Sequence, residues 1–133
     1  MSALAAFCTI VVEFFEDISE QYPEEKDIAT ATNALKLLKK SNPRLLYKGF
    51  MKAFTDDIRK HVMAEDEEAL LESAKEMMTT KYSSIGYAFW IFDKHWSTMS
   101  ETNKQHVWKY IKAMIVLAGR VPPASQISQT APL

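Results

Sequence analysis

Apolar residues recur every three or four positions along most of this chain, and no other feature constrains its fold as strongly. This spacing places side chains on one face of an α-helix. Glycine fills only three of the 133 positions, too few for the many tight turns of an all-β domain. The pattern therefore predicts an all-α fold, an irregular bundle of five or six helices.

Prolines and capping residues divide the first half of this pattern into helices. Pro23 ends the first apolar stripe, and the second stripe begins among the acids that follow it. Asn42 and Pro43 have the residue types of an N-cap and a first helical position. A four-residue apolar repeat then predicts one long helix from 43 to about 62.

Three further segments follow in the second half. A short helix is expected to begin within 64–68, where four acids stand together, and a loop over 79–84. The run from Ile85 to Phe92 is apolar on every side, and helical spacing continues to Trp96. The length of the segment 85–96 favours a helix over a strand, either buried or covered by another chain. The last helix follows Ser100, and Gly119 is its expected C-cap.

The length fits one domain, which we place at residues 1–120. Residues 121–133 contain three prolines among small polar residues and are predicted to form a flexible tail. The longest apolar run, 4–12, is far shorter than the roughly 20 residues of a membrane span, so no transmembrane segment is expected.

The number of cysteines limits the possible disulfides and metal sites and indicates the redox state of the compartment. Cys8 is the single cysteine, which excludes an intrachain disulfide and a multi-cysteine zinc site and favours an intracellular, reducing setting. Its position within an apolar run predicts a buried core thiol with a raised pKa.

Catalytic and metal-ligating patterns are absent from the sequence. His61, His95 and His106 lack paired ligand spacing, and no serine or cysteine stands in a nucleophile motif. We therefore expect a non-enzymatic protein with no cofactor, no metal and no small-molecule substrate. The remaining enzyme hypothesis is an active site without a sequence motif, in which Asp93, His95 and His106 would have to lie close together in the folded chain.

Aromatic residues are concentrated between 85 and 118, in greater number than one helix face buries. We expect most of them in the core and some at an interface. The leading hypothesis is a protein–protein interaction or structural protein that binds a protein partner or a second copy of itself. The expected partner-binding residues are Trp90, Trp96, Trp108 and Tyr110.

A basic segment, 36–60, supplies the alternative hypothesis. It carries eight Lys and Arg residues against two acids, although the formal net charge of the whole chain is only −1. A nucleic-acid-binding accessory protein would present these cations to a phosphate backbone. The residues expected to do so are Lys40, Arg44, Lys48 and Lys52. A solvated helix face, or a surface for an acidic partner, accounts for the same pattern.

Several packing motifs stand out along the chain. They are Phe15 with Asp17-Ile18, Tyr22-Pro23, Asn42-Pro43, and Met99-Ser100-Glu101-x-Asn103-Lys104-x-x-Val107-Trp108-Lys109-Tyr110-Ile111. In this order the motifs resemble those of small uncharacterised helical proteins of nucleocytoplasmic large DNA viruses. The resemblance covers residues 14–118, with Tyr22 in place of Phe and Ile111 in place of Leu. It implies a viral origin, a helical bundle and a place in the host cytoplasm or the virion, and it carries no catalytic residues.

Overall fold

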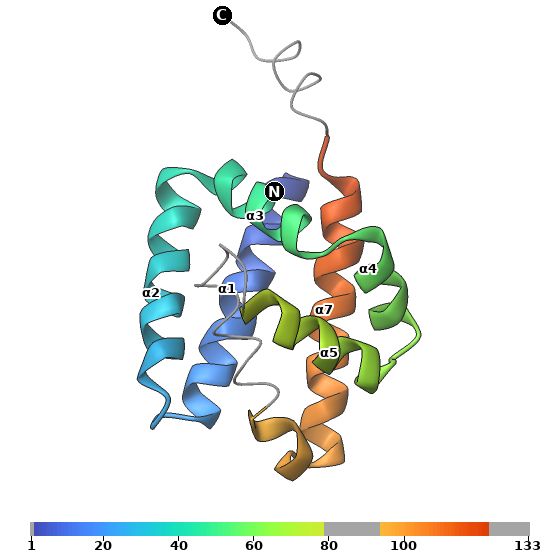
Figure 1. Ribbon diagram of the computed structural model, residues 1–133. Helices are drawn as coiled ribbons and strands as arrows, with labels where there is room; N and C mark the ends of the chain where they lie inside the picture. Colours follow the sequence, from blue (N-terminus) through green and yellow to red (C-terminus); the bar gives the residue numbers. More distant parts are fainter. Residues whose placement is uncertain (1, 79–93, 123–133) are drawn as a thin grey trace, which may run out of the picture.

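The computed structural model describes residues 2–78 and 94–122, and these form an all-α bundle with no strand among them (Figure 1). This confirms the predicted fold class. The expected loop at 79–84, most of the apolar segment 85–96 and most of the tail lie outside the described residues. The helices are α1 (Ala3–Gln21), α2 (Lys26–Ser41), α3 (Pro43–Ala53), α4 (Asp56–Met63), α5 (Glu67–Met78), the 3-10 helix η1 (Trp96–Thr98) and α7 (Glu101–Arg120).

Helices α1 and α7 form the centre of the bundle, where they pack side by side in opposite directions (Figure 1). Helix α2 packs on α1, α4 packs on α7, and α3 crosses the end of the bundle near the N-terminus. Phe7 of α1 contacts the Phe50 ring of α3 edge to face, with 4.9 Å between ring centroids. Trp108 and Ile111 of α7 are buried, as expected for a central last helix.

Side-chain caps fix where several helices begin. Asn42 accepts a hydrogen bond from the Leu45 amide through its side chain, and Pro43 takes the first position of α3, as the sequence predicts. Ser100 does the same for α7 through the Asn103 amide. Each such cap satisfies an N–H group that the first turn of a helix leaves without a partner.

The prediction of one long helix from 43 to about 62 is wrong, because the chain forms two helices in this range, α3 and α4. Helix α3 ends at Ala53, and Phe54 leaves the helical conformation. The Thr55 hydroxyl then accepts a hydrogen bond from the Ile58 amide and begins α4. The apolar repeat continues through the break because both short helices turn their apolar faces to the same core.

The end of α7 also differs from the prediction. Gly119 was expected to stop the helix, but it lies within α7, which continues to Arg120. A Cβ built at Gly119 would meet no atom within 4 Å, so no close approach requires glycine there. The short helix expected to begin within 64–68 starts at Glu67, after the Asp66 side chain accepts a hydrogen bond from the Ala69 amide.

Candidate functional site

Two of the expected partner-binding residues, Trp96 and Trp108, lie in the core instead of on the surface. Each is only 3% exposed, and their rings contact each other edge to face with centroids 5.6 Å apart. A buried ring offers a partner no area, so the expectation for these two residues is corrected. Trp96 is the first residue of η1, the short helix that precedes α7.

Tyr110 joins the two central helices. Its hydroxyl donates a hydrogen bond to the Asp17 carboxylate of α1, and its ring packs against Phe14 at 5.2 Å. The bond to Asp17, followed by burial, raises the pKa of Tyr110 to about 12. The side chain is half-buried and its polar end is occupied within the chain. Trp90, the fourth expected residue, lies outside the described residues.

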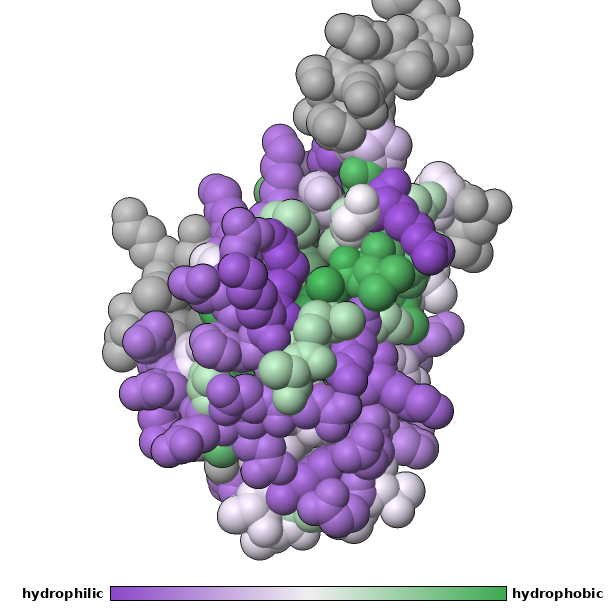
Figure 2. All heavy atoms as spheres, turned by 90° about the vertical axis from the view of Figure 1, so that its right-hand side faces the viewer, coloured by the Kyte–Doolittle hydropathy of each residue, from purple (hydrophilic) through white to green (hydrophobic). Residues whose placement is uncertain are grey.

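The exposed apolar side chains of this half of the molecule lie instead where α4 packs on α7. Val116 of α7 is 44% exposed and Met63 of α4 is 49% exposed. We call these two residues the α7 patch. Figure 2 shows this side of the molecule, where apolar residues gather within a largely hydrophilic surface.

The ends of the α7 patch carry positive charge. Lys109 and Arg120 lie seven residues before and four residues after Val116, so all three share one face of α7, and both cations are exposed. Lys112, between them, pairs with Glu65 through a contact of 2.5 Å between Nζ and Oε2. That ion pair holds the turn between α4 and α5 against α7.

A second surface is formed where α2 meets α3. Lys40, Lys48 and Lys52 are exposed there, as the nucleic-acid hypothesis requires. Two leucines share the surface with them: Leu37 is 69% exposed and Leu45 is 51% exposed. We call these five residues the α2–α3 corner.

Arg44, the remaining cation expected at this surface, is occupied by the fold. Its guanidinium donates a hydrogen bond to the Pro122 carbonyl at 3.1 Å and lies 5.7 Å from the centre of the Tyr47 ring. It therefore ties the start of α3 to the chain just beyond α7. The structure brings Lys40, Lys48 and Lys52 to the surface with the leucines, and assigns Arg44 a packing role.

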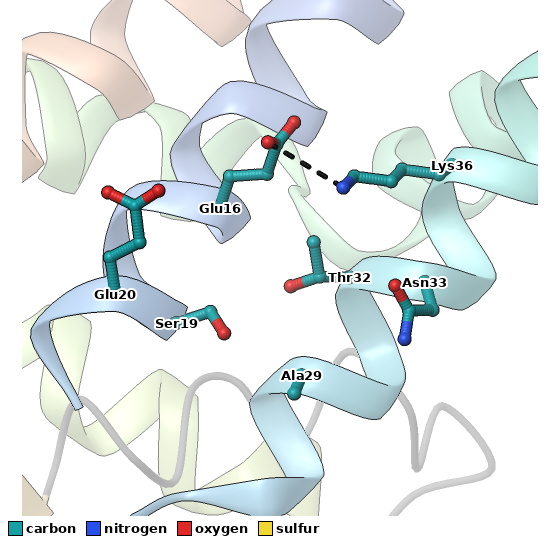
Figure 3. A pocket seen from close by; sticks show the side chains of 7 residues that line it. All are labelled: Glu16, Ser19, Glu20, Ala29, Thr32, Asn33 and Lys36. Atoms are coloured by element: carbon teal, nitrogen blue, oxygen red, sulfur yellow. Dashed lines mark ion pairs between the residues drawn. The ribbon is translucent and has the colours of Figure 1, made fainter. Parts of the chain in front are cut away.

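A shallow groove of about 170 Å³ separates α1 from α2 (Figure 3). An ion pair between Glu16 and Lys36, 3.6 Å long, spans it, and Thr32 also lines it. Pockets for drug-sized ligands usually enclose roughly 300–1,000 Å³ and are mainly apolar. This groove is smaller and is lined mainly by polar side chains, so it gives no support to a small-molecule site.

The three histidines have separate environments. His61 lies 3.6 Å from an Asp66 oxygen, His106 is exposed on α7, and His95 contacts Glu25 at 2.9 Å. Asp93, the acid that an active site without a sequence motif would need, lies outside the described residues. The convergence of Asp93 with His95 and His106 that the enzyme hypothesis requires therefore falls outside the described residues.

One group among the described residues has the donor atoms of a metal site: Glu24, Glu25 and His95 offer ligand atoms within 4.8 Å of one another. Glu25 already has a cationic partner, because Lys94 Nζ lies 2.6 Å from one of its carboxylate oxygens, and the same oxygen contacts His95. Hydrogen bonds from Lys94 and then from His95 lower the pKa of Glu25. His95 also stacks on the Tyr22 ring at 4.1 Å. Through these contacts the group links the turn between α1 and α2 to the segment that precedes α7, which is a structural role.

Cys8 is a core residue, as the sequence predicts. It is fully buried, burial raises the pKa of its thiol, and its Sγ lies 3.6 Å from the Pro43 carbonyl. A neutral, enclosed thiol is a poor nucleophile.

Comparison with known proteins gives no match: no family model, no curated protein and no solved structure is similar to this chain. Among the described residues, no helix combines the length and the apolar character needed to cross a membrane. The functional argument therefore depends on the chain's own surfaces.

Proposed function

We propose that this chain is a non-enzymatic protein–protein interaction or structural protein, and that the α7 patch binds its partner. The observation that supports the proposal is the joint exposure of Val116 and Met63 on two helices that pack together. Isolated exposed hydrophobics are ordinary, whereas apolar residues gathered from two elements are typical of interaction sites.

The charges around the patch indicate the chemistry of the partner. Lys109 and Arg120 flank Val116 on the exposed face of α7, with no acid on that stripe between them. A second copy placed antiparallel on α7 about Val116 would bring these cations toward one another, which is unfavourable. The fitting partner is a different protein that covers Val116 and Met63 with apolar side chains and places carboxylates near Lys109 and Arg120.

Site-specific photo-crosslinking tests this proposal. A photoreactive residue at Val116 in the full chain should capture a defined partner from cells that express the protein, and Met63→Asp should abolish that adduct. The same Met63→Asp change should leave the far-ultraviolet circular dichroism spectrum unaltered because the side chain is exposed.

Leu37→Asp is the matched control, since it adds the same charge at an exposed apolar residue on another helix. The adduct should survive this change. An adduct that is insensitive to Met63→Asp, or a chain that sediments as a monomer and yields no adduct, contradicts the proposal. The viral origin and the place in the virion or host cytoplasm stay predictions from the sequence.

A further inference from the structure

We propose that the α2–α3 corner docks on an anionic lipid surface, with Leu37 and Leu45 inserted among the acyl chains and Lys40, Lys48 and Lys52 at the lipid phosphates. The proposal does not depend on the proposed function, because it concerns a different surface.

The first argument is the charge of the corner. Residues 28–55 contain six Lys and Arg residues and no Asp or Glu, although the whole chain has 17 acids. Lys36 is paired with Glu16, Arg44 donates to the Pro122 carbonyl, and Lys39 is partly buried. Lys40, Lys48 and Lys52 are left as exposed cations with no ion pair among the described residues. A local cationic surface of this kind is attracted to anionic lipid even when the net charge of the protein is near zero.

The second argument is the placement of the leucines. Leu37 and Leu45 are the two most exposed large hydrophobic residues in the described part of the chain. Each stands next to a leucine that packs inward: Leu38 is partly buried against the core and Leu46 is 5% exposed. The inward leucines account for the packing of α2 and α3. The outward pair adds apolar area that the fold does not use.

The third argument is geometric. No loop separates the two helices, because Asn42 serves as the C-cap of α2 and the N-cap of α3. Leu37 lies five residues before Asn42 and Leu45 three residues after it. At 1.5 Å of rise per residue, the Cα atoms of the two leucines are about 13 Å apart at most, so both leucines lie close to the junction of the two helices.

Each helix also places its lysines beside its leucine. Leu37 and Lys40 are three residues apart on α2, and Leu45, Lys48 and Lys52 follow at three- and four-residue steps on α3. Residues at these steps share a helix face. This arrangement of leucine next to lysine is the pattern by which helices bind at a lipid interface.

The leucines favour lipid over the other anionic partners. A phosphate backbone binds lysines but has no apolar interior for exposed leucines. An acidic protein would need two separate apolar pockets placed to match Leu37 and Leu45. A lipid leaflet binds lysines at its phosphates and leucines among its acyl chains, and it does not require a fixed spacing between them.

Vesicle co-sedimentation of the full chain at low salt tests the proposal. The protein should bind vesicles of phosphatidylcholine that contain phosphatidylserine, and should not bind phosphatidylcholine alone. Reversing two charges with Lys48→Glu and Lys52→Glu should lower the partition coefficient about twentyfold or more, since each lysine near the surface contributes about fivefold. Leu37→Ser with Leu45→Ser should lower it about tenfold, as expected for partly inserted side chains.

Two control variants match these changes. Lys26→Glu with Lys75→Glu alters the net charge equally at exposed lysines away from the corner, and Met63→Ser with Val116→Ser removes exposed apolar area from the α7 patch. Both should retain vesicle binding to within about twofold, a small fraction of the effect at the corner. Retention by the second control also keeps this result separate from the partner test at the α7 patch.

Three outcomes overturn the proposal. The first is absence of binding to the phosphatidylserine vesicles. The second is binding that is lost with the lysines but unchanged by the leucine substitutions, which would assign the surface to an acidic protein or a nucleic acid. The third is tighter retention of a DNA duplex than of the vesicles at the same salt concentration, with no effect of the leucine changes; that result would establish the nucleic-acid alternative.

Discussion

The central α1–α7 pair and the α2–α3 corner use their apolar residues in opposite ways. Between α1 and α7, large side chains such as Phe7, Trp108 and Ile111 are buried. At the corner, Leu37 and Leu45 are exposed beside lysines. In this chain, therefore, the large aromatic side chains mark the buried core that stabilises the fold. Exposed leucines beside lysines without an ion pair mark the surface that we propose for binding.

The strongest test of this comparison is truncation in the core. Trp108→Ala should reduce the free energy of unfolding by about 3–5 kcal/mol, because it removes a buried aromatic ring and leaves a cavity beside Trp96. Guanidinium denaturation followed by circular dichroism measures this. Lys109→Ala, at the next and exposed position, is the control and should change the free energy by less than about 0.5 kcal/mol.

Two adjacent leucines on α3 sharpen the comparison. Leu46→Ala should cost about 2–5 kcal/mol because the side chain is buried against the core. Leu45→Ala removes the same atoms from an exposed position and should cost less than about 0.5 kcal/mol. Equal losses for the two substitutions, measured by the same denaturation, would show that Leu45 has a packing role and would remove it from the proposed docking surface.

A smaller effect is expected at the junction of α2 and α3. Asn42→Ala removes the side-chain cap of α3 and should lower the free energy of unfolding by about 1 kcal/mol. Asn42→Asp restores an acceptor and should recover most of the loss. A neutral Asn42→Ala would show that the Asn42 side chain does not stabilise the start of α3.

The smallest effect concerns pH. The folded pKa of Tyr110, about 12, is higher than the ordinary value of 10.0, so the neutral phenol is the form that the fold stabilises. This contribution is fully present below pH 10 and is lost as the pH rises through about 12, where the phenolate would face the Asp17 carboxylate. The difference in Tm between wild type and Tyr110→Phe should therefore shrink over that interval. A difference that stays constant would contradict the hydrogen bond to Asp17.

Much of the fold was accessible from the sequence because its signals are local. The apolar period predicted an all-α chain, and Asn42 and Ser100 were readable as helix starts since capping depends on residues only three positions apart. The break at Phe54 was missed although Thr55 and the acids after it form an N-cap signal, because the apolar repeat runs across the break.

The surfaces were less predictable because exposure is decided by tertiary packing. Trp96 and Trp108 have the residue type of interface anchors, yet each covers the other in the core. Leu45 and Leu46 are identical in type, and only the rotation of α3 against α1 determines which of them faces solvent. The lysines at 40, 48 and 52 were predicted, whereas their position beside two exposed leucines required the structure.

The most direct test of the account measures stability and lipid binding on one variant, Leu37→Ser with Leu45→Ser. We predict a free energy of unfolding within about 1 kcal/mol of the wild type, together with loss of about nine-tenths of the binding to phosphatidylserine vesicles. Unchanged vesicle binding, or a loss of stability of several kcal/mol, would contradict the claim that the α2–α3 corner is a binding surface that the fold leaves unused.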